Sequence, residues 1–133
     1  MEMMETRIIK EKPPVVYDLD DYRHGLRNRP NDTQITITPH HKVDLWTIQA
    51  GQTVSPHMHE NSECIVIVLA GRGNYMRGDQ SREIAKEMMA VTPPGQAHSF
   101  RNTNAEPLVL VTIEGPGPFD TGPSGSSPAE SFY

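Results

Sequence analysis

Three of the six histidines in this chain lie in two short segments with a spacing that is typical of metal ligands. His57 and His59 are two residues apart, and on a β-strand residues two apart project from the same face. His98 follows a Pro-Pro-Gly turn at residues 93–95, so a separate extended segment supplies a third imidazole. Neutral imidazole binds Zn, Cu, Fe and Ni, at a metal–nitrogen distance of about 2.0–2.1 Å in zinc sites. Because inward positions of different strands meet near the axis of a small β-barrel, the pattern predicts one divalent metal ion held by all three histidines.

Short extended segments dominate the middle of the chain. They are rich in β-branched or apolar residues and are separated by Gly, Pro or Asn, which is typical of an all-β domain. The expected strands are residues 15–17, 35–38, 43–49, 64–70, 88–92 and 108–113. Two further stretches have helical alternatives. We expect a turn or two of helix at 18–26, and a strand at 81–89 because that stretch follows a tight turn at Gly78 and Asp79.

The two ends of the chain differ in composition from the middle. A chain of 133 residues suffices for one domain with one hydrophobic core. Residues 1–14 are charged, Met-rich and end in two prolines, so we expect a flexible arm. Residues 116–133 are dominated by Gly, Pro and Ser, and we expect a disordered tail there. The predicted domain is therefore residues 15–115.

Charge and composition exclude several classes of partner. The net charge is −5 and the twelve Lys and Arg residues form no block, which argues against nucleic acid. No stretch approaches the ~20 apolar residues that cross a bilayer, and the first residues do not resemble a secretion signal, so we expect a cytoplasmic protein without membrane contact. Cys64 is the single cysteine, which rules out an internal disulfide and a multi-thiolate zinc site.

The order of these features resembles the cupin superfamily. The first cupin motif reads Gly, five residues, His-x-His, three or four residues, Glu, six residues, Gly; the second reads Pro-x-Gly, two residues, His, three residues, Asn. The matching positions are Gly51, His57, His59 and Gly71 in the first motif, and Pro93, Gly95, His98 and Asn102 in the second. The resemblance covers roughly residues 40 to 115 and implies a β-barrel of the double-stranded β-helix, or jelly-roll, type with a metal ion on these histidines. The paired motifs are specific for fold and ligands, and not for a reaction.

The chain departs from the cupin pattern at the family glutamate, and two alternatives stay open. Counting three residues after His59 reaches Glu63, which leaves seven residues before Gly71 and requires an extra residue in the following strand, such as a β-bulge. Counting four reaches Cys64 without a gap, a spacing similar to that of cysteine dioxygenases, which place a cysteine beside a three-histidine iron. We favour Glu63 as the fourth ligand, because a carboxylate is the commoner solution and uninterrupted strand parity from His59 would turn it inward. In the alternative, Cys64 occupies the position, or is simply a small buried residue, and Glu63 is its neighbour.

A second departure is Glu87, which stands where the family has a glycine six positions before Pro93. We expect it to alter only a turn between two strands.

Candidate substrate-contacting and acid–base groups follow from strand parity and residue type. Phe100 shares parity with His98 and is expected on the floor of the site. Further candidates for substrate contact, which core packing explains equally well, are Trp46, Ile48 and Met76. Candidate general acids or bases are Tyr75, His41 and, if it is not a ligand, Glu63.

An ion at a barrel mouth with three or four protein ligands leaves positions open for substrate, water or dioxygen. With Fe or Mn, this arrangement suits a dioxygenase that binds dioxygen and a chelating substrate together; with Zn, Ni or Mn, it suits a Lewis-acid isomerase, epimerase or lyase. We expect a non-haem dioxygenase that acts on a small, chelating, acid-like organic molecule, with Fe favoured. The alternatives are the Lewis-acid enzymes and a non-catalytic protein that binds or senses a small ligand. A homodimer is expected, because small cupins commonly pair through their outer sheets and the arm could add an edge strand to a second subunit.

Overall fold

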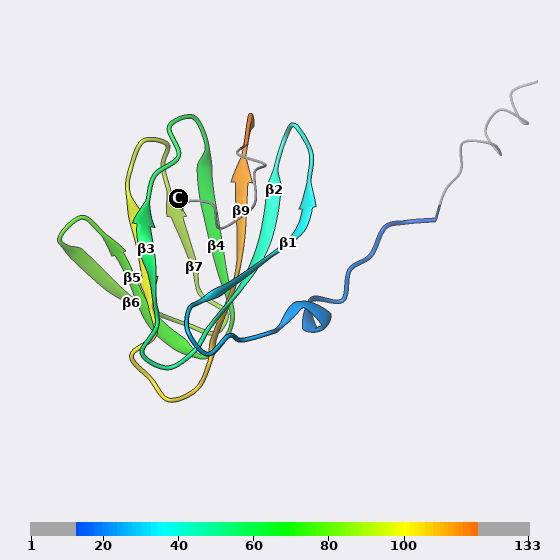
Figure 1. Cartoon of the computed structure of the whole chain (residues 1–133). Helices are drawn as coiled ribbons and strands as arrows, with labels where there is room; N and C mark the ends of the chain where they lie inside the picture. The colour runs from blue at the N-terminus through cyan, green and yellow to red at the C-terminus, as the bar shows by residue number, and fades with distance from the viewer. Residues whose placement is uncertain (1–12, 120–133) are drawn as a thin grey trace, which may run out of the picture.

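Two antiparallel sheets make up the domain in a computed structural model that describes residues 13–119 (Figure 1). Most of the predicted arm (residues 1–12) and most of the predicted tail (residues 120–133) lie outside the described residues. The elements, in chain order, are the 3-10 helix η1 (Leu19–Tyr22) and the strands β1 (Asn31–Ile37), β2 (Lys42–Ile48), β3 (Thr53–His57), β4 (Glu63–Ala70), β5 (Arg72–Arg77), β6 (Gln80–Ala85), β7 (Met89–Thr92), β8 (His98–Arg101) and β9 (Leu108–Gly115). One sheet has the order β1-β2-β9-β4-β7 and the other β3-β8-β5-β6.

The sheets enclose one apolar core on their facing sides, here called the inner faces. Alternation along β4 places Cys64, Val66 and Val68 on the inner face, all at most 2% exposed. Strands from both sheets contribute to this core, whose buried members are Ile48, Val54, Cys64, Val66, Val68, Ile84, Phe100, Leu108 and Leu110. A second apolar cluster lies on the outer face of the larger sheet, where η1 covers β2 and β9. The all-β prediction is therefore confirmed.

The inner face of β2 and β9 changes from apolar to polar along the strands. Ile48 pairs with Leu108 at one end, and both are fully buried. At the other end Lys42 pairs with Glu114, and between these ends Asp44 pairs with Thr112. The carboxylates of Asp44 and Glu114 are buried despite their charge, with 5% and 8% of their residue surfaces exposed. Buried charges are unusual away from functional sites, so this polar end of the barrel is where a site is expected.

Three local expectations met different outcomes. Residues 15–17 form no strand, and Val15 and Val16 are exposed. The predicted helix within 18–26 is limited to η1, which Asp18 caps by accepting a hydrogen bond from the Asp20 amide. The stretch 81–89 contains the end of β6, as favoured, and then a turn in which Glu87 has a positive φ of 75°. That conformation explains why glycine is the family residue there.

Candidate metal centre

Two neighbouring strands of the smaller sheet carry the predicted ligands. β3 pairs with β8, and His57 lies directly opposite His98. The register shifts between Val54 and His57, so β3 has one residue more than β8 over this stretch. Such a bulge reverses strand parity locally. It thereby turns both Val54, which is in the core, and His57 to the inner face.

The two cupin motifs also hold each other in place. The amide of Gly51 donates to the Asn102 carbonyl (2.8 Å), and the amide of Asn102 donates to the Gln52 carbonyl (3.0 Å). At the other end of the strand pair, the Gly95 amide donates to the His59 carbonyl (2.8 Å). Gly51 and Gly95 have φ values of 81° and 80°, which favour glycine. The motif glycines thus close the turns that set β3 against β8.

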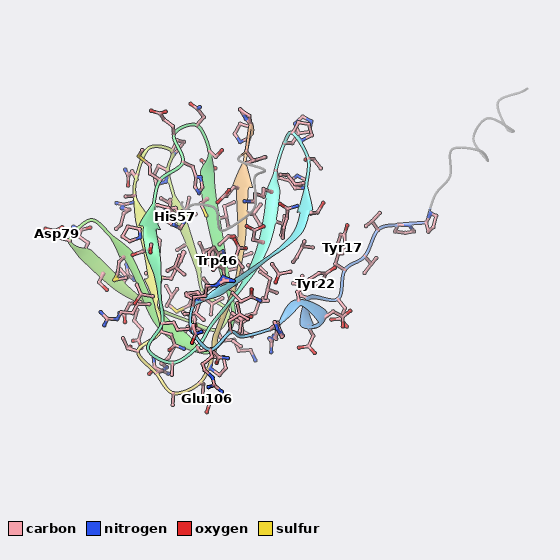
Figure 2. All side chains as sticks on the ribbon, in the orientation of Figure 1. Tyr17, Tyr22, Trp46, His57, Asp79 and Glu106 are labelled. Atoms are coloured by element: carbon pink, nitrogen blue, oxygen red, sulfur yellow. The ribbon has the colours of Figure 1, made fainter. Side chains whose placement is uncertain are left out.

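The three histidine rings come together at the polar end of the barrel. The ring centroid of His57 lies 4.3 Å from that of His98 and 5.3 Å from that of His59, and the third separation is 6.1 Å. His59 follows the end of β3, while Met58 between the two points outward and is 52% exposed. Figure 2 shows His57 beside β3, far from the Glu106 loop at the opposite end of the barrel. The predicted convergence of the three rings is present.

Hydrogen bonds and burial set the tautomer and the protonation state of two of these rings, His57 and His98. His57 Nδ1 lies 3.1 Å from the Ser55 carbonyl oxygen, and His98 Nδ1 lies 3.5 Å from that of Gln96. A carbonyl oxygen only accepts, so Nδ1 carries the proton and the lone pair is on Nε2. Burial, together with the neighbouring imidazoles, lowers the pKa of His57 to about 3 and that of His98 to about 4. Both rings are therefore neutral near pH 7, which is the ligand form.

The Nε2 atom of His98 is the buried nitrogen that most directly suggests a metal ligand. His98 is 2% exposed, and its Nε2 atom is buried without a hydrogen-bond partner. An unmet buried acceptor is costly, and a metal ion would satisfy it. Within residues 13–119, no three His, Cys, Asp or Glu side chains are arranged so that they could hold a metal ion as they stand, and binding one would need these side chains to rearrange. The donor set, its neutrality and the unmet nitrogen fit a divalent ion.

The preference for Glu63 over Cys64 does not agree with the strand geometry. β4 pairs with β9 in unbroken register from Glu63 to Val68, and a register shift comes only after Val68. Cys64 faces the inner side and is 1% exposed, whereas Glu63 is exposed on the opposite side. The bulge that the Glu63 alternative required is present, but it lies too far along β4 to turn Glu63 inward. Burial, with the nearby Glu114 carboxylate, raises the pKa of the Cys64 thiol, so that it remains protonated.

Glu114 is a carboxylate that contacts one of the three histidines, and it was not among the site residues predicted from the sequence. It lies at the end of β9, directly opposite Cys64 on β4. Its Oε2 atom is 2.8 Å from His59 Nε2, and the Glu114 side chain is 10% exposed. Strand parity could have found it, because it continues the inner-face series of Leu108 and Leu110.

A second group of charges lies beside Glu114 on β1 and β2. Lys42 Nζ is 3.5 Å from Asp44 Oδ2. The carboxyl groups of Asp32 and Asp44 are close enough to hydrogen-bond, and one buried oxygen of each, Oδ1, has no donor. A proton held by one of the two carboxyl groups would let it donate a hydrogen bond to the other. Burial, and then the Asp44 charge, raise the pKa of Asp32 to about 8.

The other predicted site residues divide into three groups. Phe100 packs under His98, with ring centroids 5.9 Å apart, and suits the predicted floor. Ile48 is a fully buried core residue, and Trp46 packs against the same core. Met76 pairs with Ser99, so it lies on the face opposite Phe100 and cannot line the interior.

The acid–base candidates are also placed. The Tyr75 hydroxyl hydrogen-bonds the Thr92 hydroxyl, and its ring centroid is 6.4 Å from that of His98. His41 lies just before β2, outside the ring cluster. Tyr75 is therefore the one predicted acid–base group whose side chain is shown beside the histidines.

A shallow depression occurs at the opposite end of the barrel, lined by residues that include Gly71, Lys86 and Asn104. It contains none of the histidines, and we assign no chemistry to it. Over residues 13–119, no helix has the length and apolar character needed to cross a bilayer.

The family model for the cupin domain matches residues 44–114, more than half of the chain, and the protein therefore belongs to the cupin family. An uncharacterized protein of Streptomyces coelicolor, SCO3923, is 30% identical over 74 residues, which are 56% of this chain and 70% of that protein. A conserved double-stranded β-helix protein from Klebsiella pneumoniae has a TM-score of 0.75 at 24% identity, covering 79% of this chain and 92% of its own. A predicted oxalate decarboxylase from Thermotoga maritima has a TM-score of 0.55 at 22% identity, covering 57% and 66%. At these identities the structural likenesses show the shared fold.

Proposed function

We propose that this protein is a metal-dependent cupin enzyme that acts on a small, chelating, acid-like organic molecule. The observation that carries the proposal is the meeting of His57, His59 and His98, with the buried His98 Nε2 atom lacking a partner. A divalent ion, when bound, supplies a Lewis acid or a redox centre with open positions for the substrate. We favour a dioxygenase with Fe, as expected from the sequence.

Different side chains around this centre exclude water, orient the substrate and balance charge. Phe100 and the apolar core below it exclude water from one side of the histidines. Tyr75 and Thr92 offer hydroxyl groups that can orient a polar substrate. Burial disfavours the charged form of Lys42, but the Asp44 and Glu114 carboxylates raise its pKa, so the ammonium keeps its charge and offsets part of theirs.

Oxygen consumption tests the favoured reaction. The protein is stripped of metal, loaded with Fe2+ and mixed with small acids, diketones, phenols and thiols in an oxygen electrode. Substrate-dependent oxygen uptake that His98→Ala abolishes supports a dioxygenase. No uptake with any of these compounds, from protein that holds iron, contradicts it.

Lewis-acid isomerase, epimerase or lyase chemistry is the second candidate. It is favoured by the Asp32–Asp44 pair and Tyr75, which place groups able to hold and release protons inside the barrel. Protein loaded with Zn2+, Ni2+ or Mn2+ would then exchange an acidic substrate C–H for deuterium in heavy water, measured by NMR. Ligand binding without oxygen uptake or exchange would instead indicate a sensing protein.

A homodimer remains part of the proposal. Val15 and Val16 lie exposed just before η1, and Met89 and Val91 are exposed on the edge strand β7. Apolar residues on a sheet edge are often covered by a partner. Light scattering should therefore give the mass of two chains, and a monomer mass at working concentration would contradict this.

A further inference from the structure

Glu114 on β9 contacts His59, while the position of the family glutamate lies on the neighbouring strand β4. We infer that Glu114 is the fourth protein ligand of the metal ion. It takes the role of the family glutamate, whose position in this chain is Glu63 or Cys64. This inference rests on the proposed metal centre. It assigns a ligand that neither of the two cupin motifs contains.

The inward carboxylate and the inward short side chain lie on neighbouring strands, β9 and β4. Cys64 occupies the inward position on β4 and is paired with Glu114 on β9. A cysteine side chain is shorter than glutamate, so it leaves room for the long side chain opposite it. The carboxylate thereby enters the same part of the interior from the adjacent strand.

Glu114 contacts a ring nitrogen that can coordinate a metal ion. Glu114 Oε2 lies 2.8 Å from Nε2 of His59. His57 and His98 hold Nδ1 against backbone carbonyl oxygens, so their coordinating atom is Nε2. If His59 also coordinates through Nε2, the Glu114 carboxylate lies next to the coordinating nitrogen and therefore next to the ion. Two ligand atoms each ~2.1 Å from one ion at right angles are about 3 Å apart, which is close to the observed separation.

The negative charge of Glu114 also favours a cation at this end of the barrel. Glu114 is buried, and a buried carboxylate is retained where a cation compensates it. Lys42 is its cross-strand neighbour, but the Lys42 ammonium is already 3.5 Å from Asp44. Lys42 carries one positive charge, which cannot balance both Asp44 and Glu114. A divalent cation at the histidines would supply the missing positive charge.

The alternative is that Glu114 orients His59 from outside the coordination shell. A carboxylate in that role hydrogen-bonds the ring nitrogen that does not face the metal. The two roles predict different spectra. Visible absorption of bound Co2+ depends on the atoms that coordinate it, and loss of a ligand changes the spectrum.

The test compares Co2+ binding by the full-length metal-free protein and three variants. Glu114→Gln removes the proposed ligand, Glu63→Gln is the matched control on β4, and His98→Ala tests the centre itself. Calorimetry gives the affinity and visible absorption reports the coordination. We expect Glu114→Gln to bind Co2+ at least tenfold more weakly with an altered spectrum. Glu63→Gln should match the wild type in both measurements.

The outcomes separate this inference from the proposed metal centre. A wild-type protein that binds no Co2+, or one that binds equally well after His98→Ala, contradicts both. Loss of binding only in His98→Ala, with Glu114→Gln like the wild type, overturns the Glu114 assignment alone. Weaker binding by Glu114→Gln with an unchanged spectrum also overturns it, because the carboxylate then acts through His59. Circular dichroism checks folding, and Glu114→Asp, which withdraws the carboxylate by one methylene, replaces Glu114→Gln if that variant does not fold.

Discussion

Cys64 and Glu114 face each other across β4 and β9, and the longer of the two reaches His59. This pairing allows the ligand carboxylate to be exchanged between strands. In Cys64→Glu, a second carboxylate stands next to Glu114 in a buried site. We expect the metal-free variant to lose about 2–4 kcal/mol of unfolding free energy, because two buried like charges repel and lack partners.

The double variant Cys64→Glu with Glu114→Gln returns a single carboxylate to this part of the barrel. We expect it to bind Co2+ more tightly than Glu114→Gln alone, and to recover much of the lost stability. Calorimetry and urea denaturation measure the two effects. Equal Co2+ affinity in the double variant and Glu114→Gln would show that the two positions cannot substitute for each other.

The Asp32–Asp44 pair should make stability depend on pH. Burial raises the pKa of Asp32 to about 8, from an ordinary value of 3.8. Between these values the folded protein keeps a proton that the unfolded chain releases, so stability falls as pH rises through this window. Asp32→Asn removes the titrating group. The wild type should therefore lose about 3 kcal/mol relative to Asp32→Asn between pH 5.5 and 8.5.

Urea denaturation of the two metal-free proteins at several pH values measures this difference. The groups that face Asp32 are Asp44, Lys42 and Glu114, and all three are kept in the variant. His57 and His98, whose pKa values are lowered, are present in both proteins, so their contribution largely cancels in the comparison. Parallel curves for the two proteins would show that Asp32 holds no extra proton.

Glu87 offers a stabilising substitution. Its φ of 75° lies in the left-handed region, where a residue with a Cβ atom is strained by about 1–2 kcal/mol. Its amide donates to the Val68 carbonyl, which holds the turn in this conformation. Glu87→Gly should relieve the strain and, after the entropic cost of glycine, stabilise the protein by about 0.5–1 kcal/mol. Thermal denaturation measures this, with Glu87→Ala as the control that keeps the Cβ and should gain nothing.

Asn102 should be essential for stability and not for chemistry. It is fully buried, and its Nδ2 donates to the carbonyl oxygens of Ile48 (2.9 Å) and Glu106 (2.8 Å), while Oδ1 accepts from the Asn104 amide. Asn102→Ala leaves these groups unpaired and should cost about 3 kcal/mol. Asn104→Ala, which removes one exposed hydrogen bond to the Arg72 carbonyl, should cost less than about 1 kcal/mol. Equal losses in chemical denaturation would contradict this role.

Local pattern alone was sufficient for much of the fold and for the histidines. Short runs rich in β-branched or apolar residues, separated by Gly, Pro or Asn, predicted most strands. The spacing of His57 and His59 predicted that both turn to one side. Pro93 and Gly95 predicted the turn that leads into the strand of His98. These features depend on residues near one another in the chain, so their consequences can be read from a short window.

Other features depend on which strands become neighbours. Strand parity from His59 turned Glu63 inward only if the strand continued, but β3 ends at His57 and β4 starts afresh at Glu63. Glu114, Asp32 and Asp44 are far apart in the chain, and only the pairing of β1, β2 and β9 brings them to one place. The sequence does not show which residue a charged side chain in an apolar strand will contact. Its burial, and the histidine or lysine beside it, are decided by the register of the sheet, which forms only when distant segments pack together.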